Sequence, residues 1–204
     1  MLENLSAIIS NPNSILALIA LLILIAAFIY MKKIHFTTKM VMQLGLMIAL
    51  AVVLHMIKLY HLPQGGSVTP GGMLPLLLIS FCYGPAVGFL TGFCYGLLNL
   101  IQDPFILSPL QVLFDYPLPY MALGLAGYFS KNIYLGATVG IVARFICHFI
   151  SGVVFFGSYV PEETSIYAYS LIFNASYLVP ELIICLILLK LLPIKRFLTL
   201  MKRR

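Results

Sequence analysis

Long apolar runs separated by short polar stretches dominate the chain. There are seven such runs, and they cover residues 14–31, 39–60, 70–83, 84–101, 109–129, 133–156 and 167–190. A transmembrane helix needs about 20 apolar residues, which most of these runs supply. The short, proline-rich run 70–83 is expected to be tilted or irregular. A β-barrel would instead show short segments of alternating hydrophobicity. The pattern therefore predicts an all-α polytopic membrane protein.

The composition agrees with a membrane protein of one domain. Of the 204 residues, 62% are hydrophobic and 9% are charged, and the mean hydropathy is +1.06. No linker or low-complexity stretch divides the chain. The net charge of +6 does not indicate a nucleic-acid partner. Most of the positive residues lie at the ends of the apolar runs, where they set the orientation in the bilayer.

Lysine and arginine gather on one side of the predicted bundle. Alternation through seven helices places ten of them together: Lys32, Lys33, Lys39, Lys131, Lys190, Lys195, Arg196, Lys202, Arg203 and Arg204. The opposite side carries Glu3, Asp103, Glu162 and Glu163, with Lys58 near its edge. Because cytoplasmic loops are enriched in Lys and Arg, we expect the N-terminus outside and the C-terminus in the cytoplasm.

The first run has the length of a signal peptide as well as of a helix. It begins after Glu3 and Asn4 instead of a basic segment, and no A-x-A site follows it. We therefore interpret it as a retained transmembrane helix.

Three polar residues are predicted to lie at one depth in the outer half of the membrane. Asp115 interrupts the run "LQVLFDYPLPY", and a charge there costs enough free energy to suggest a site or a partner. Counted from the outer helix ends, Asp115, His148 and Asn174 lie roughly 9, 12 and 10 Å deep. This coincidence predicts a pocket reached from outside.

The spacing of the neighbouring residues indicates which ligand such a pocket suits. One helix face carries a stripe at every fourth position, formed by Arg144, His148, Gly152 and Phe156. Tyr116 and Tyr169 add aromatic rings close to Asp115 and Asn174. A carboxylate among aromatic rings suits an aromatic cation, through charge pairing and cation–π attraction.

Each of these residues also has a structural interpretation. The alternative is that Asp115 and His148 form a buried pair that only joins helices, and Asn174 alone is typical of a hydrogen bond between helices. Arg144 and Glu181 lie deeper, at roughly 18 and 21 Å. We interpret these two as a structural ion pair outside the site.

Small residues predict close helix packing. Gly84, Gly88, Gly92 and Gly96 share one face, which we expect to pack inside the bundle. Gly45 and Ala49 form a weaker pair that is either internal or faces a partner protein. The outer loop 61–72, rich in Gly and Pro, is either a lid over the pocket or an ordinary connection.

Nothing in the chain recommends an enzyme, a metal site or a cofactor. There is no P-loop, no G-x-S-G motif and no pair of aspartates within the apolar runs. The cysteines have no metal-ligand spacing and are interpreted as packing residues: Cys82, Cys94, Cys147 and Cys185.

Four motifs in order resemble one family. They are "LPQGGSVTPGGMLPLLL", "SPLQVLFDYPLPYMALGLAG", "RFICHFISGVVFFGSYVPE" and "YSLIFNASYLVPE". They are similar to the thiamine-specific substrate-binding subunit (S component, ThiT/YuaJ family) of energy-coupling factor (ECF) transporters of the bacterial cell membrane. The resemblance implies a six-helix S-component core over 39–192, preceded by an extra transmembrane helix and basic loop (1–38) and followed by a basic cytoplasmic tail (193–204).

The resemblance implies that the ligand is thiamine, captured from outside. It places Asp115 on the aminopyrimidine, with Tyr169 and Asn174 lining that ring. Phe156 stands where some members stack a tryptophan, a residue this chain lacks.

For the thiazolium, the resemblance implies that His148 and Tyr116 lie near the ring and that Gly152 offers a backbone contact. An aromatic residue from the first core loop caps this ring in the family, and Tyr60 and His61 are the candidates. The motifs leave open whether thiamine phosphates or precursors also bind.

The resemblance further implies partners: a membrane coupling protein, which Gly45 and Ala49 contact, and two cytosolic ATPases, besides the lipid bilayer. Two other classes remain open from the residues alone. One is a stand-alone carrier of a cationic solute, in which Asp115 and His148 relay protons. The other is a structural or chaperone-like membrane subunit.

Overall fold

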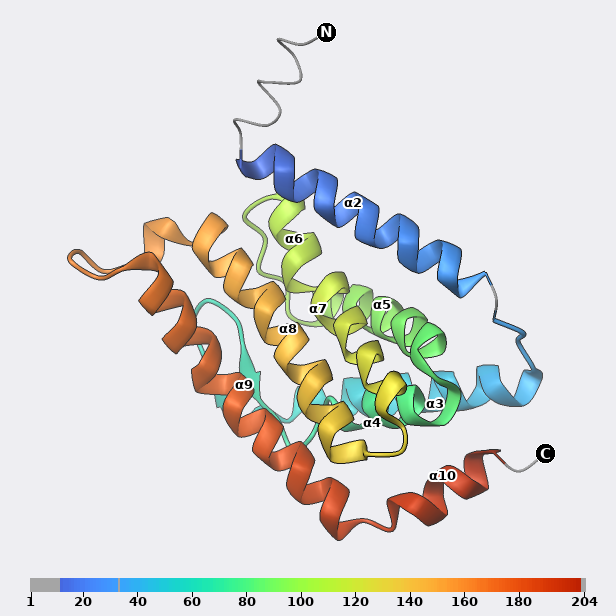
Figure 1. The fold of residues 1–204 in the computed structure, drawn as a ribbon. Helices are drawn as coiled ribbons and strands as arrows, with labels where there is room; N and C mark the ends of the chain where they lie inside the picture. The colour runs from blue at the N-terminus through green and yellow to red at the C-terminus, as the bar shows by residue number, and fades with distance from the viewer. Residues whose placement is uncertain (1–11, 33, 203–204) are drawn as a thin grey trace, which may run out of the picture.

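The computed structural model describes residues 12–32 and 34–202, which form a helical bundle (Figure 1). Glu3, Asn4, Lys33, Arg203 and Arg204, which entered the arguments on orientation and on the first run, lie outside the described residues. In chain order the elements are α2 (Pro12–Met31), α3 (Thr38–Met56), β1 (Tyr60–His61), β2 (Ser67–Val68), α4 (Leu74–Tyr83), α5 (Pro85–Gln102), α6 (Pro109–Asp115), α7 (Pro117–Ala122), the 3-10 helix η1 (Leu123–Phe129), α8 (Ile133–Phe155), the short 3-10 helix η2 (Gly157–Tyr159), α9 (Ile166–Leu191) and α10 (Ile194–Lys202).

The prediction of a helical multi-pass membrane protein is confirmed. Within the described residues, five helices are long and apolar enough to cross a membrane: α2, α3, α5, α8 and α9. The run 70–83 yields only the ten-residue α4, in keeping with its expected irregularity.

The run 109–129 is not one helix, contrary to the prediction. Helix α6 ends at Asp115, and Tyr116, with φ −119° and ψ −79°, separates it from α7. Pro117 and Pro119 follow at once, and neither ring nitrogen can donate a helical hydrogen bond. The chain continues as α7 and then as the tighter η1. Asp115 therefore lies at a helix break, not inside a continuous span.

Two further boundaries differ from the prediction. Helix α3 ends at Met56 instead of residue 60, because Tyr60 pairs with Val68 and His61 with Ser67 in a small antiparallel hairpin. The segment 193–204, predicted as a tail, contains α10, whose residues Phe197 and Leu198 pack on the buried clusters of the bundle.

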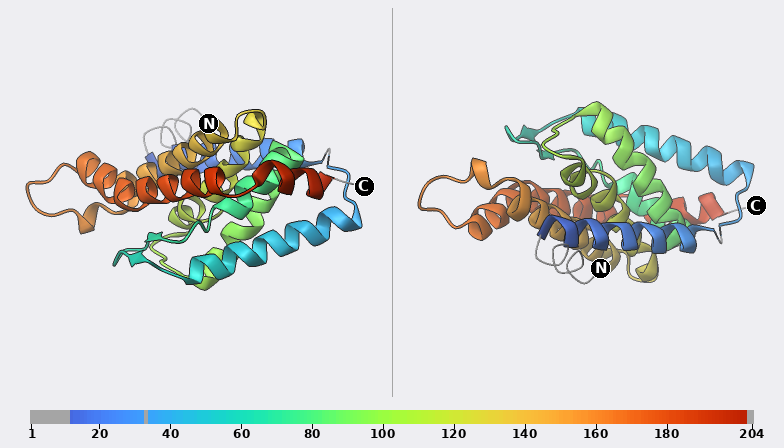
Figure 2. Two further views of the ribbon diagram at one scale, coloured as in Figure 1. Left: turned by 90° about the horizontal axis from the view of Figure 1, so that it is seen from below. Right: turned by 90° about the horizontal axis from the view of Figure 1, so that it is seen from above.

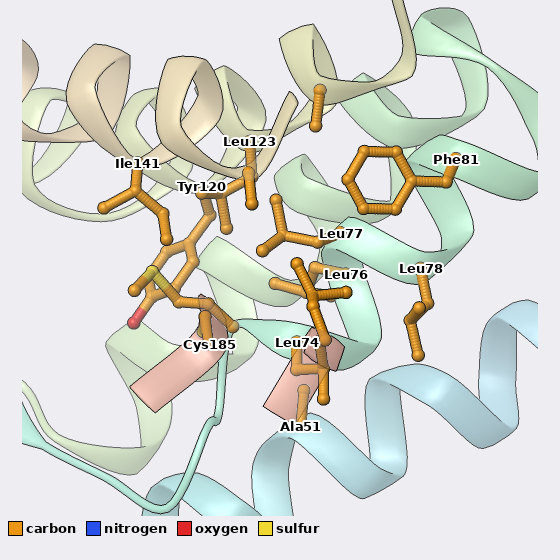
Figure 3. Close-up of a cluster of buried hydrophobic side chains, with 14 of the residues drawn as sticks. Ala51, Leu74, Leu76, Leu77, Leu78, Phe81, Tyr120, Leu123, Ile141 and Cys185 are labelled. Atoms are coloured by element: carbon orange, nitrogen blue, oxygen red, sulfur yellow. The ribbon is translucent and has the colours of Figure 1, made fainter. Parts of the chain in front are cut away.

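Helix α4 lies at the centre of the core. Its residues from Leu74 to Cys82 are all buried, as expected for a helix that is apolar on every side. Figure 3 shows Leu76, Leu77 and Phe81 packed against side chains from other helices, among them Tyr120, Leu123, Ile141 and Cys185.

The glycine face of α5 packs inside the bundle at three of its four predicted positions. The exception is Gly84, which precedes α5 and where a Cβ would meet nothing within 4 Å. A Cβ added at Gly92 would lie 2.1 Å from the Tyr120 carbonyl oxygen, and one at Gly96 would lie 2.6 Å from that of Tyr116. Only glycine lets α5 approach the backbone of α7 this closely, and the contact supports the helix break beside Asp115.

The connections gather at two ends of the bundle. The β-hairpin and the loop between α8 and α9 lie at one end, and the α2–α3 connection and α10 lie at the other (Figures 1 and 2). The hairpin end includes Glu162 and Glu163, whereas the α10 end includes Lys195 and Arg196.

Candidate functional site

A pocket opens at the hairpin end of the bundle. Its wall includes the hairpin turn from Gln64 to Ser67, together with residues of α3, α5, α6, α8 and α9. All seven side chains or backbone positions singled out from the sequence line it: Asp115, Tyr116, His148, Gly152, Phe156, Tyr169 and Asn174. Predicted residues of separate helices thus meet in one pocket.

Asp115 lies at the C-terminal end of α6 and is held by two neighbours. Gln111, one helical turn earlier and fully buried, donates from Nε2 to Asp115 Oδ2. His148 on α8 approaches the other carboxylate oxygen, with 3.4 Å between Nδ1 and Oδ1. These contacts offset part of the free-energy cost of a carboxylate inside the bundle.

Arg144 fixes the protonation pattern of His148. The guanidinium Nε donates to His148 Nε2 at 3.3 Å, so Nε2 accepts and the imidazole proton is on Nδ1, facing Asp115. Arg144 also donates to the Tyr120 hydroxyl at 3.1 Å, and its guanidinium carbon lies 4.1 Å from that ring's centroid. The Tyr120 hydroxyl in turn contacts His55 Nε2 on α3 at 3.1 Å.

The predicted ion pair between Arg144 and Glu181 is wrong. No contact within 4.0 Å joins their charged groups. Arg144 lines the pocket instead, whereas Glu181 Oε1 accepts hydrogen bonds from the backbone N–H and the hydroxyl of Thr69, the latter at 2.6 Å. Their similar predicted depth did not bring the two charges together, because their side chains face different neighbours.

Asn174 and Gly152 join α9 to α8 at the pocket wall. The Asn174 amide donates to the His148 carbonyl at 3.3 Å and to the Ser170 carbonyl at 2.9 Å, and its oxygen accepts from Tyr177. A Cβ at Gly152 would lie 2.2 Å from Ser170 Oγ. Both residues therefore serve helix packing, the alternative considered for Asn174, while also facing the pocket.

Aromatic rings surround the mouth of the pocket. Phe156 stacks on Phe105, with ring centroids 5.7 Å apart and an interplanar angle of 17°. Tyr159 packs against both rings. Deeper on α9, Tyr169 stacks on Phe173 at 5.9 Å. A flat ligand ring would find parallel faces here.

The Tyr116 hydroxyl forms hydrogen bonds with the backbone of the connection between α5 and α6. It donates to the Asp103 carbonyl at 2.8 Å and accepts from the Phe105 backbone N–H at 2.6 Å. Gln111 supports the same connection, since its amide donates to the Phe105 carbonyl and its oxygen accepts from the Leu107 N–H. The ring of Tyr116 remains part of the pocket wall.

Sequence reasoning missed several residues of the site: Asn99, Asp103, Phe105 and Arg144, which line the pocket, and Gln111, which holds Asp115. The contact of Gln111 with Asp115 could have been predicted, since residues four apart on a helix are neighbours. Asp103 and Phe105 belong to a connection, where no periodicity indicates direction. Arg144 was assigned to another contact although it belongs to the same stripe as His148.

The face with Gly45 and Ala49 is separate from the pocket. Both residues are exposed on α3, and a Cβ at Gly45 would meet nothing within 4 Å. Neighbouring Met42 and Leu46 are exposed by more than 60% of their surface. This side of α3 is therefore uncovered in the described chain.

These features define a class of protein: a helical membrane protein with a polar, aromatic-lined pocket for a small solute. Among the described residues, no group of three or more His, Cys, Asp or Glu side chains is arranged to hold a metal ion. Comparison with known proteins narrows the class.

The family described as thiamine transporter protein (Thia_YuaJ) matches residues 41–200, and the chain belongs to it. The thiamine transporter ThiT of Bacillus subtilis (strain 168) is 37% identical over 169 residues, which cover 74% of this chain and 88% of that protein. ThiT of Lacticaseibacillus paracasei (strain ATCC 334) is 32% identical over 123 residues, covering 50% of this chain and 61% of that protein.

The solved structure of ThiT from Listeria monocytogenes has the same fold. It aligns with a TM-score of 0.70 at 23% identity, covering 79% of this chain and 96% of that one. The family predicted from the motifs is thus confirmed, and it is a family of transporters, not of enzymes. Helix α2 precedes the residues that the family matches.

Proposed function

We propose that this chain is the substrate-binding subunit of a thiamine uptake system and that the pocket described above takes thiamine from the outer side of the cell membrane. Membership of the thiamine transporter family supports the substrate. The observation that carries the site is the carboxylate of Asp115, held by Gln111 and His148 in a pocket lined by aromatic rings. An anion among aromatic faces suits thiamine, which joins an aminopyrimidine to a cationic thiazolium.

Each of the seven predicted site residues then has a proposed role. Asp115 accepts hydrogen bonds from the aminopyrimidine, and Phe156 stacks on this ring. Tyr169 and Asn174 line the same ring.

The remaining predicted residues belong to the thiazolium. Tyr116 and the neutral imidazole of His148 lie beside this ring, and Gly152 offers backbone contact. The Arg144 guanidinium, already bonded to Tyr120 and His148, stays below the ligand as support for the imidazole.

We also propose seven membrane crossings, with the N-terminus outside and the C-terminus in the cytoplasm. On this view α4 and the broken segment α6–α7–η1 complete a six-helix core, and α2 is an added transmembrane helix. The separation of Glu162 and Glu163 from Lys195 and Arg196 at opposite ends supports this orientation.

Transport requires energy, and the chain has no P-loop motif with which to hydrolyse ATP. We propose that a membrane coupling protein and two cytosolic ATPases supply it, as in ECF transporters. The open small-residue face of α3, with Gly45 and Ala49, is the proposed contact with the coupling protein, since small residues let helices approach closely.

The experiment that tests the proposed site is titration of the purified protein with thiamine, its aminopyrimidine fragment and its thiazolium fragment. Calorimetry should show saturable binding of thiamine at one site, with weaker binding of each fragment. Thiamine that binds no better than either fragment would contradict a pocket that uses both rings.

The contact between His148 and Asp115 also favours a second candidate, a stand-alone carrier that relays protons through this pair. Reconstituted vesicles distinguish the two. A coupled subunit gives uptake only with the ATPases and ATP, whereas a carrier gives uptake with a proton gradient alone.

A further inference from the structure

Asp103 is a second carboxylate of the pocket wall, and the proposed function leaves it without a role. It caps the C-terminal end of α5, and 37% of its side chain is exposed, against 15% for Asp115. It therefore lies nearer to the solvent than Asp115 in the wall of the same pocket.

The backbone of Asp103 is fixed by hydrogen bonds. Its N–H donates to the Asn99 carbonyl at 2.9 Å, and its carbonyl accepts from the Tyr116 hydroxyl at 2.8 Å. The same hydroxyl holds the N–H of Phe105. The carboxylate is thus presented from a connection whose backbone is held by hydrogen bonds.

Lys58 neutralises this carboxylate. Its Nζ lies 2.6 Å from Asp103 Oδ2, and its side chain is 30% exposed. It is not among the residues that line the pocket, so the ammonium approaches Asp103 from outside the wall. Exposed ion pairs contribute little to stability because both charges remain hydrated, so this pair opens at small cost.

The charges of the pocket wall differ between its inner and outer ends. Its formally charged lining residues are Asp103, Asp115 and Arg144, and the guanidinium is buried at the inner end beside Tyr120 and His148. A cationic ring is repelled by this guanidinium and attracted by the two carboxylates. The outer carboxylate is the one that an entering cation meets first.

We propose that Asp103 is an outer counter-ion for the cationic ring of the ligand and that Lys58 holds its place until the ligand arrives. As thiamine enters, its positive charge replaces the Lys58 ammonium beside Asp103, and the lysine side chain swings into the solvent. Asp103 attracts the cation toward the mouth, and Lys58 sets how strongly. This inference rests on the proposed function.

The test compares thiamine with 3-deazathiamine, a neutral analogue in which carbon replaces the charged thiazolium nitrogen. Association rates are measured by stopped-flow at low salt. Asp103→Asn should slow thiamine association about three- to tenfold, because one attracting charge is lost. Lys58→Gln should speed it by a similar factor. Neither substitution should change the rate for the neutral analogue, and high salt should shrink both effects.

Two matched variants serve as controls. Glu162→Gln removes an acidic charge at the same end but outside the pocket wall, and Lys131→Gln removes a basic charge before α8. Both should leave thiamine association within about twofold of the parent.

Equal changes for thiamine and the neutral analogue would overturn the proposal and make Asp103 a structural residue. Unchanged thiamine rates in both variants would overturn it as well. If Asp103→Asn does not fold, the Lys58→Gln result decides. A parent protein that binds no thiamine would instead contradict the proposed function.

Discussion

Asp115 shows how a costly charge is kept in an apolar bundle. Its carboxylate accepts from Gln111 and contacts His148, and it lies at a helix break facing a pocket. We predict that Asp115→Asn lowers thiamine affinity roughly ten- to a hundredfold or more, because a charge-assisted hydrogen bond contributes about 1.5–3 kcal/mol. Calorimetry measures the affinity and thermal melting checks the fold, which should survive. An Asn variant that binds as tightly as the parent would show that the carboxylate has another purpose.

The candidate residues could be predicted from the sequence because depth and helical spacing bring polar residues of separate helices to one level. Depth does not give direction around the helix axis, so the pairing of Arg144 with Glu181 was predicted wrongly. The wall of the pocket also includes Asp103 and Phe105. These lie in a connection whose path depends on hydrogen bonds to Tyr116 and Gln111.

Among the elements, the segment between the hairpin and α4 is tied to α9 by buried hydrogen bonds. Glu181 accepts twice from Thr69, whose hydroxyl also accepts from the Gly72 N–H at 2.9 Å. The hairpin turn just before this segment, Gln64–Ser67, forms part of the pocket wall. The contact therefore links the position of a wall segment to α9.

We predict that Thr69→Val lowers the free energy of unfolding by about 1–3 kcal/mol, since the carboxylate and the Gly72 N–H each lose a partner. Thiamine should also dissociate faster, because the hairpin loses its anchor. Thermal melting and stopped-flow dissociation measure the two effects. Thr138→Val removes an exposed hydroxyl from α8 and should change neither. A Thr69 variant with normal melting and dissociation would show that Glu181 does not hold this segment.

The glycines of two helices should respond in opposite ways to alanine. Gly92→Ala places a Cβ against the Tyr120 carbonyl, so the backbones must separate at a cost of about 1–3 kcal/mol. Gly45→Ala meets open space and should leave stability unchanged or slightly higher. Melting temperatures of the two purified variants test this. Equal melting temperatures would contradict the close packing of α5 on α7.

Helices α2, α5, α8 and α9 could be predicted from apolar length alone, because each is a continuous run with a clear end. The break at Tyr116 depends on two prolines within an apolar run, which hydropathy does not register. Helix α10 escaped prediction because its basic residues resemble a tail. Its apolar residues reveal a helix only when they meet the bundle.

At the scale of the whole molecule, the proposed orientation predicts on which side of the membrane each end of the helical bundle lies. A reporter fused to the C-terminus should be cytoplasmic, and one inserted in the loop 157–166 should be outside, because the basic residues favour the cytoplasm. A third reporter at residues 130–132 should match the C-terminal one. The same side for the C-terminus and the loop 157–166 would contradict seven crossings and the outward-facing pocket together.

Helix α2 lies along α5 and α6, outside the residues that the family matches (Figure 1). Its fully buried Ala20 belongs to a cluster with Phe114 and Leu118, and Phe28 packs edge-on against Phe93 at 5.4 Å. Phe114 immediately precedes Asp115, yet no residue of α2 lines the pocket.

We therefore predict that deletion of residues 1–31 weakens the bundle more than it weakens binding. Lipid tails are as apolar as the lost helix, so they replace much of its contact with α5 and α6. The melting temperature should fall by about 2–6 °C, in line with a loss of about 1–2 kcal/mol. The thiamine dissociation constant should stay within about threefold of the parent value. A folded deletion variant that binds thiamine a hundredfold more weakly would show instead that α2 holds Phe114, and through it the carboxylate of Asp115, in place.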